Sequence, residues 1–437
     1  MNILARIKRI DWLIVISTLI LVVLGIFVIY SAGMLFTGEL VSNEYVKQII
    51  WAVIGIICML VVAMLDTKTL KEYSFWIYLA SILILIYTRM FGKVVNGAKS
   101  WIGIGNFGIQ PSEFAKLATI LYLSKYLSEF TNYTQKLRTF LISLAIIFVP
   151  VLLILSQPDL GTALVFFPIY IALAFVYNIE KKYWSYFLFI LLLGGFFTIL
   201  PIFSEKILGD SIPFLHIFYK TELVKILLIS LVIITLVALS GYYFTKRKYY
   251  LGIVYIVSIL LFSTSFGYLA NKVLKNYQIM RLAVFLDPQI DPLGSGWNII
   301  QSVTAIGSGG FLGKGYLQGT QSHYRYLPQQ STDFIFSILA EEFGFIGCFI
   351  IFIIFFFIIY RILNSMRNTN DTFSHGILSG IASMMLFHFA VNVGMAMGIM
   401  PITGIPLLFL SYGGSSLLSS CIGIGLVLSA GIRREKL

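Results

Sequence analysis

A single aspartate, Asp333, stands where a long polar stretch meets a long apolar run, in the segment LPQQSTDF at 327–334. A carboxylate partly removed from water there has a raised pKa, and such a group can act as a general base. The simpler interpretation is that Thr332 or Asp333 caps the following helix, where an acid also suits the helix dipole. Glu341 and Glu342 follow in the same run, either as rival acids or as a buried pair that needs partners.

A second polar group interrupts an apolar region at QPSEFAK, residues 110–116. Pro111 suits the first turn of a helix, and Ser112 could cap it. Glu113 and Lys116 are three residues apart, so on a helix they share a face and can form an ion pair. That pair either holds the helix in its bundle or lines a groove for a lipid headgroup, because ionisable residues at membrane depth are functional candidates.

Further candidates lie in turn-forming segments. Asp159, in QPDLGT at 157–162, either caps the next helix or makes a polar contact in an outer cavity. Arg281 is followed by two Asp-Pro turn formers and could bind a diphosphate through two parallel hydrogen bonds. Lys314 lies in the glycine-rich run 307–315, which permits close backbone approach to a ligand, although no strand and helix frame a nucleotide-binding P-loop.

These residues belong to a chain that is too apolar for a soluble protein. Of 437 residues, 59% are apolar and only 11% are charged, against about 25% charged in an average soluble domain. The composition excludes a soluble enzyme, a disordered protein and a nucleic-acid binder, and indicates a polytopic membrane protein. The net charge, 31 − 19 = +12, then marks cytoplasmic loops and contacts with anionic lipids. Scattered cysteines and histidines favour neither a disulfide framework nor a zinc site.

The apolar runs predict an all-α protein with about twelve spans, since a spanning helix needs about 20 mostly apolar residues. The runs are 12–34, 48–65, 73–90, 112–127, 139–156, 160–177, 183–201, 223–244, 249–267, 333–361, 374–399 and 404–431. The stretch 268–332 is predicted as a large outer loop that folds back on the bundle, because it is rich in aromatic and aliphatic residues. The halves show no repeat, which removes the usual sequence support for a secondary transporter.

Lys and Arg in the short loops place both termini in the cytoplasm. The loops then predicted to be cytoplasmic carry Lys68 and Lys71, Lys136 and Arg138, Lys181 and Lys182, residues 246–248, Arg361 and Arg367, and the tail 433–436. One predicted outer loop, 89–111, breaks the rule with Arg89, Lys93 and Lys99. These cations are either tolerated by the overall bias or face an anionic ligand.

Several blocks in this order resemble the SEDS family of membrane proteins (RodA, FtsW, SpoVE). They are NGAKSW (96–101), QPSEFAK (110–116), QPDLGT (157–162), LDP (286–288), 294–315, GTQ (319–321), TDFIF (332–336) with AEE (340–342), and PITGIPLL (401–408) through SYGGS (411–415). Together they cover nearly the whole chain, 1–437, as one SEDS-type membrane domain. The segment GTQS before Leu327-Pro328 favours the RodA branch.

The resemblance implies a peptidoglycan glycosyltransferase that polymerises lipid II into glycan strands at the outer face of the bacterial cytoplasmic membrane. It implies that Asp333 is the residue essential for polymerisation, and that Glu113, Lys116 and Asp159 are polar positions of a central cavity. Gln321, in the GTQ block, is carried over as a substrate-binding residue. A class B penicillin-binding protein that supplies transpeptidation is the implied partner.

One departure from the family pattern is the number of spans. The family usually has ten, so the surplus is predicted to be an inserted hairpin within 183–248, which preserves the orientation of the later loops.

The implied reaction needs a base, a site for the leaving group and a membrane groove. The acceptor hydroxyl loses its proton, for which Asp333 is the candidate base. The departing undecaprenyl diphosphate needs its charge neutralised by Arg281, Lys314 or Lys116, or by a divalent cation such as Mg²⁺ or Mn²⁺. A lipid II flippase and a non-catalytic scaffold for a penicillin-binding protein remain as alternatives.

Overall fold

The computed structural model describes residues 8–95, 97–104, 107–130, 136–207, 212–274 and 276–432. The chain divides into two compact units: unit 1, with Met1–Ile179 and Gln301–Leu437, and unit 2, with Glu180–Ile300. The cationic tail 433–436 and Asn96 of the first family block lie outside the described residues. Each unit is described separately below.

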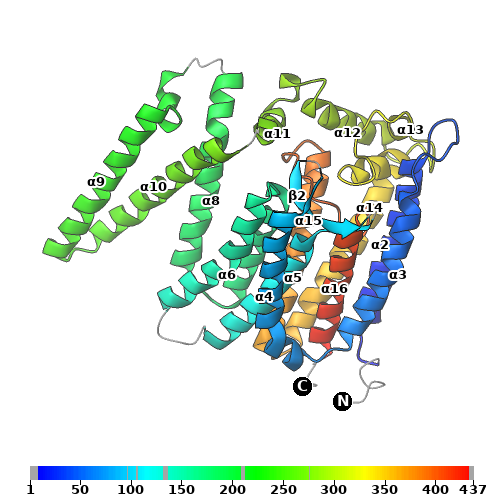
Figure 1. The fold of residues 1–437 in the computed structure, drawn as a ribbon, viewed down its shortest axis with the longest axis horizontal. Coiled ribbons are helices and arrows are strands. Elements are labelled where there is room, and N and C mark those ends of the chain that lie inside the picture. Colours follow the sequence, from blue (N-terminus) through cyan, green and yellow to red (C-terminus); the bar gives the residue numbers. More distant parts are fainter. Residues whose placement is uncertain are drawn as a thin grey trace. The chain divides into compact units, whose positions relative to one another are not determined.

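Unit 1 is a bundle of long helices. They are α2 (Trp12–Gly33), α3 (Glu44–Ala63), α4 (Thr67–Phe91), α5 (Pro111–Phe130), α6 (Lys136–Ser156), α7 (Leu160–Val176), α14 (Ile335–Arg367), α15 (Thr372–Ala396) and α16 (Gly414–Gly431). Within it, α16 packs on α3, α14 packs on α2, and α15 contacts α5, α7 and α14 (Figure 1). Helices α15 and α16 form the centre of the bundle, since 78% and 89% of the residues in their most apolar stretches are buried.

Unit 2 consists mainly of three long helices, α8 (Lys181–Ile202), α9 (Thr221–Thr245) and α10 (Tyr249–Val273). Helix α10 packs on both α8 and α9, and α9 with α10 forms the antiparallel green hairpin of Figure 1. Short helical turns, η1 (Phe203–Ile207) and η2 (Pro213–Phe218), lie between α8 and α9. The segment predicted as an inserted hairpin, 183–248, therefore holds α8 and α9.

Each of the twelve predicted runs falls on one long helix. Among the described residues, ten helices are long and apolar enough to span a membrane, and α7 is a shorter apolar helix. Helix α5 has 20 residues but is less apolar because it carries four charged residues, Glu113, Lys116, Lys125 and Glu129. The all-α membrane fold is confirmed. The last run was predicted to begin at 404, which is wrong, because α16 begins at Gly414 after an irregular segment.

The stretch 268–332, predicted as an outer loop, is largely folded into short helices, although its first residues, 268–273, belong to α10. It contains α11 (Asn276–Leu286), η3 (Pro288–Ile290), α12 (Ser295–Gly309) and α13 (Thr320–His323). The Asp287 side chain accepts a hydrogen bond from the Gln289 N–H at 2.9 Å, so the first Asp-Pro pair forms the expected turn.

A small antiparallel sheet, absent from the sequence prediction, occupies the loop 89–111. Its strands are β1 (Lys93–Val95), β2 (Ala98–Ile104) and β3 (Phe107–Ile109), in the order β1-β2-β3. The Lys99 ammonium donates to the Met90 carbonyl at the end of α4, at 2.7 Å, and the Lys99 N–H donates to the Gln157 carbonyl. A cation at a helix C-terminus is favourable, which gives Lys99 a structural role.

Candidate functional site

Asp333 lies in a tight turn two residues before α14. The N–H groups of Thr332, Asp333 and Phe334 all donate to the Gln329 carbonyl, at 3.2–3.5 Å, and Gln329 has a positive φ of 51°. The N-cap position of α14 is Phe334, and no side chain caps it. The prediction that Thr332 or Asp333 caps this helix is therefore wrong, because the turn moves both residues outside the first helical turn.

Three hydrogen bonds hold this turn in unit 1. The Gln330 side chain donates to the Ala32 carbonyl at the end of α2, at 2.7 Å. The Tyr412 N–H donates to the Ser331 carbonyl at 2.8 Å. The Asn392 amide, from α15, donates to the Asp333 carbonyl at 2.9 Å. The backbone of Asp333 is thus fixed by three separate elements while its side chain remains partly exposed.

Helix α15 connects this turn to the segment 397–413. The Asn392 amide also donates to the Ile405 carbonyl at 2.8 Å. One turn away on the same helix face, His388 Nδ1 lies 3.1 Å from the Pro406 carbonyl oxygen. Since a carbonyl can only accept, Nδ1 carries the proton and donates, which leaves Nε2 of a neutral ring as an acceptor.

That acceptor lies 3.1 Å from the Lys116 ammonium of α5. Lys116 also pairs with Glu113 Oε1 at 2.8 Å, and Ser419 of α16 donates to Glu113 Oε2 at 3.2 Å. The two charged side chains are only 1% and 4% exposed. The predicted Glu113–Lys116 ion pair is confirmed, and it belongs to a buried polar chain that runs from Ser419 to the Asp333 carbonyl.

Asp159 caps α7, as one of its two interpretations predicts. Its carboxylate accepts from the Thr162 N–H at 3.1 Å, from the Thr162 hydroxyl at 2.9 Å and from the Gln110 amide at 2.7 Å. Burial raises the pKa of Asp159, and Glu113 raises it further, whereas the hydrogen bonds from Thr162 and Gln110 oppose the shift. The Gln110 contact joins Asp159 to the start of α5, the helix that carries Glu113 and Lys116.

Several buried polar atoms at this end of unit 1 have no hydrogen-bond partner within the described residues. They are Ser112 Oγ, Gln330 Oε1, Asn392 Oδ1 and Thr403 Oγ1. The prediction that Ser112 caps α5 is therefore wrong. An unpaired buried polar group costs about 1–3 kcal/mol, so this region is suited to hydrogen bonding with a polar ligand.

The buried carboxylate Glu341 collects an unusual number of donors. Its oxygens accept from the Lys314 ammonium at 2.8 Å and from the backbone N–H groups of Thr320, Gln321 and Ser322 at 2.8–3.2 Å. The Glu341 side chain is fully buried and Lys314 is 25% exposed. Glu341 thus anchors α13, which favours a structural role over that of a rival acid. Gln321 Oε1 is buried without a partner.

Glu342 anchors the same segment to α2. It accepts from the Ser31 hydroxyl, and one of its oxygens lies 3.3 Å from His323 Nε2. His323 Nδ1 lies 3.0 Å from the Met34 carbonyl. The Glu342 carboxylate raises the pKa of His323. Both carboxylates of the predicted buried pair therefore have partners, and together they hold 319–323 against α2 and α14.

The glycine-rich segment packs on a break in α14. Gly344 interrupts that helix with a φ of 63°. There Phe345 donates to the Gly310 carbonyl at 3.0 Å, and Gly315 donates to the Glu342 carbonyl at 3.0 Å. A Cβ on Gly313 would lie 2.2 Å from the Glu342 oxygen. The close backbone approach expected of these glycines is made to α14.

Arg281 lies in α11 of unit 2 and is partly buried. Within the described residues, no group of three or more His, Cys, Asp or Glu side chains could hold a metal ion. These side chains do not form a site for Mg²⁺ or Mn²⁺.

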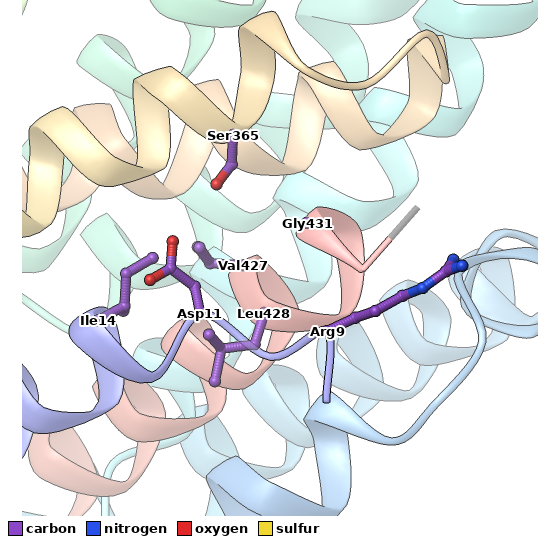
Figure 2. A pocket seen from close by; sticks show the side chains of 7 residues that line it. All are labelled: Arg9, Asp11, Ile14, Ser365, Val427, Leu428 and Gly431. Atoms are coloured by element: carbon purple, nitrogen blue, oxygen red, sulfur yellow. The ribbon is translucent and has the colours of Figure 1, made fainter. Parts of the chain in front are cut away.

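A small pocket lies at the opposite end of unit 1. There Arg361 of α14 forms a 2.6 Å ion pair with Asp11, the residue before α2. Figure 2 shows Asp11 and Ser365 facing the space between α2, α14 and α16, while Arg9 extends away. The space has no room for even a water molecule, so it is not a small-molecule site. Asp11 lies at one end of the packed helices α2 and α14, where it pairs with Arg361. The Asp333 turn lies at the other end, where Gln330 contacts Ala32.

His388, Asn392 and Ser419 are residues of this site that the sequence prediction missed. His388 and Asn392 lie inside the apolar run 374–399. The rule that selected Glu113 and Lys116, that ionisable residues at membrane depth are functional candidates, would have selected His388 as well.

The fold and the buried polar chain define a multi-pass membrane protein with an intramembrane polar site. The chain belongs to the FtsW/RodA/SpoVE family of cell cycle proteins, whose model matches residues 11–210 and 202–436.

Named relatives match along nearly the whole chain. It is 48% identical to the peptidoglycan glycosyltransferase RodA of Treponema pallidum, over 97% of this chain and 98% of the relative. It is 33% identical to the stage V sporulation protein E of Bacillus subtilis, over 96% of each chain. It is 31% identical to the peptidoglycan glycosyltransferase MrdB of Escherichia coli K12, over 96% of this chain and 94% of the relative.

Solved structures agree with this assignment. A chain from a peptidoglycan synthase complex that coordinates polymerization and crosslinking has a TM-score of 0.67 and 25% identity, covering 97% of this chain and 98% of that chain. The rod shape determining protein RodA of Thermus thermophilus has a TM-score of 0.60 and 23% identity, covering 98% of each. The second likeness supports the fold alone.

Proposed function

We propose that this protein is a peptidoglycan glycosyltransferase that polymerises lipid II into glycan strands at the outer face of the cytoplasmic membrane. The relatives that bear this enzyme name match nearly the full chain. The observation that carries the proposal is the Asp333 turn, fixed by α2 and α15 and linked through Asn392 and His388 to the Glu113–Lys116 pair. A carboxylate on a rigid backbone beside unpaired polar groups suits a catalytic base.

The orientation follows from the loop charges. With the N-terminus in the cytoplasm, Asp11 and Arg361 lie at the cytoplasmic end of α2 and α14, and Asp333 lies at the outer end. Both termini are then cytoplasmic. The whole chain, 1–437, acts as one membrane domain, with an inserted hairpin in 183–248 and the outer loop 268–332.

The Asp333 carboxylate removes the proton from the 4-hydroxyl of the acceptor GlcNAc. The hydroxyl oxygen forms a bond to the anomeric carbon of the donor MurNAc, and the bond from that carbon to undecaprenyl diphosphate breaks, with inversion. A positioned base typically contributes 10²–10⁴-fold to the rate. No nucleotide is needed, because the diphosphate bond supplies the free energy.

The leaving diphosphate gains charge that cations must stabilise. Lys116 and Lys314 each have one carboxylate partner already. Arg281 offers a planar fork that matches a diphosphate. We assign this role to Lys116, because Lys314 is held by Glu341 and Thr320 against α14. No step is routed through a metal ion.

The substrates and partner follow from the same activity. Lipid II and the nascent glycan strand both carry a polyprenyl chain, which the membrane bundle accommodates. A class B penicillin-binding protein crosslinks the strand, in keeping with the synthase complex that contains a structural relative.

An Asp333→Asn variant tests the proposal directly. Purified wild-type protein in vesicles with lipid II confined to the accessible leaflet is expected to form polymer. The variant should polymerise at least 100-fold more slowly, since its amide cannot accept the proton. Glu39→Gln, which changes an exposed acid in the loop after α2, is the matched control and should keep full activity. Wild-type polymer yield from Asp333→Asn would refute the base, and lipid movement without polymer would favour a flippase.

A further inference from the structure

The tip of the α9–α10 hairpin is a cationic and aromatic surface in unit 2. Helix α9 ends at Thr245 and α10 begins at Tyr249, so only Lys246, Arg247 and Lys248 link them. Each helix has 25 residues and is apolar enough to span a membrane. The three linking cations are therefore placed where the two spans leave the hydrocarbon layer.

No acidic residue neutralises these cations along the chain, because the sequence contains no Asp or Glu between Glu222 and Asp287. Elsewhere in the described part of unit 2, Lys182 pairs with Glu180 at 2.6 Å and Lys225 pairs with Glu222 at 3.0 Å. Arg247 and Lys248 are exposed at the tip. Their charge is thus available to an anion from outside the protein.

Aromatic residues flank the three cations in the chain, at 242–244 and 249–250. The Lys246 ammonium lies 4.9 Å from the centre of the Tyr243 ring, in a cation–π contact. The rings of Tyr249 and Tyr250 stack at 4.2 Å. Tyr243 is 69% exposed and Phe244 is 80% exposed. Tyrosine at a membrane surface lies at the level of the lipid headgroups, and phenylalanine packs at the boundary with the acyl chains.

The tip distributes its cations between two roles. Lys246 has a left-handed backbone, with φ of 54°, and its side chain packs on tyrosines beside the C-terminus of α9, where a cation suits the helix dipole. Among the described residues, no cation–π contact is found for the side chains of Arg247 and Lys248. Cations in a short loop can be explained by their effect on the membrane orientation of the hairpin. That effect does not explain the aromatic residues on both sides of these cations.

We propose that residues 242–250 bind the phosphate group of an anionic phospholipid. The Arg247 guanidinium can hold a phosphate through two hydrogen bonds, and the Lys248 ammonium adds a point charge. The exposed rings of Tyr243 and Phe244 then pack on the glycerol and the upper acyl chains. This site uses none of the residues assigned to polymerisation, and the inference does not depend on the proposed enzyme activity.

Native mass spectrometry of the full-length purified protein tests the proposal, with equimolar phosphatidylglycerol and phosphatidylcholine as probes. Wild-type protein is expected to retain phosphatidylglycerol in preference to phosphatidylcholine. Arg247→Gln with Lys248→Gln should weaken retention of phosphatidylglycerol roughly 30-fold, at about fivefold for each cation near the surface. Each single substitution should show about a fivefold loss, which keeps the test valid if the double variant fails to fold.

The matched control is Lys182→Gln with Lys225→Gln, which removes two cations from the same unit that already have carboxylate partners. It should change phosphatidylglycerol retention less than twofold, and Arg247→Lys with Lys248→Arg should restore most of the binding. Equal retention of both lipids by the wild type, or equal losses in the control and tip variants, would overturn the proposal. Retention of undecaprenyl phosphate without phosphatidylglycerol would overturn the phospholipid assignment.

Discussion

At the scale of single residues, α15 is the element that joins the two polar centres of unit 1. His388 and Asn392 lie one turn apart and contact the adjacent carbonyls of Pro406 and Ile405. From there, one contact leads to Lys116 and another to the Asp333 carbonyl. A change at the Glu113–Lys116 pair can therefore alter the position of Asp333 without touching it.

Lys116→Met should separate the structural and functional roles of this pair. It leaves Glu113 buried without its cation, and breaking a buried pair in this way costs about 3–5 kcal/mol. We expect a clear loss of thermal stability in detergent and weaker binding of polyprenyl diphosphate. The measurements are a thermal unfolding curve and a lipid-binding titration on the same sample.

The double variant Glu113→Gln with Lys116→Met is the control, because it removes both charges. It should recover most of the lost stability, since replacing a whole buried pair is often neutral. Binding of the diphosphate should stay weak if Lys116 contacts it. Full recovery of binding in the double variant would return Lys116 to a purely structural role.

The sequence predicts those residues of the site that are charged, interrupt an apolar run and pair with a near neighbour in the chain. Glu113 and Lys116 are three apart on one helix, so their pairing follows from spacing alone. Their contacts with His388 and Ser419 join positions 272 and 306 residues away in the chain, and no local pattern predicts them. The capping prediction for Asp333 failed because tertiary contacts fix the backbone of its turn, and that for Ser112 failed because α5 already begins at Pro111.

At the scale of elements, α14 is divided by a single residue. The apolar run after Asp333 predicts one continuous helix, and Gly344 breaks it so that two backbone groups pair with 310–311. The sequence shows the glycines but not their partner, since the same run could cradle a ligand. Similarly, 404–413 looks like the start of a span, although its backbone turns with positive φ at Gly404 and Phe409.

Gly313→Ala should be distinctly more destabilising than Gly310→Ala. Both positions have positive φ, of 82° and 59°, so both substitutions carry a similar backbone cost. Only at Gly313 would the added Cβ meet a backbone atom, whereas nothing lies within 4 Å of a Cβ at Gly310. We expect a further loss of about 1–3 kcal/mol at Gly313, measured by thermal unfolding. Equal losses of stability in the two variants would contradict this prediction, and would show that the α14 backbone near Gly344 moves to accommodate the added Cβ.

At the scale of the whole molecule, the helices could be predicted from the sequence, but the sheet could not. A run of about 20 apolar residues is a strong local signal, and each predicted run coincides with a long helix. Strands of three and seven residues in a loop with several glycines give no comparable signal. The division into two units also has no local signature, because it depends on which helices contact one another.

The orientation of the whole chain makes a prediction that cysteine labelling can check. If loop charge sets the topology, a membrane-impermeant maleimide should label Glu39→Cys and Leu293→Cys in intact cells from which the outer barrier has been removed. Lys68→Cys should react only after the membrane is permeabilised. All three positions are exposed, and two of the native cysteines, Cys348 and Cys421, are buried, so the wild type serves as the background control. Labelling of Lys68→Cys from outside would place Asp333 on the cytoplasmic side and contradict the proposed reaction at the outer face.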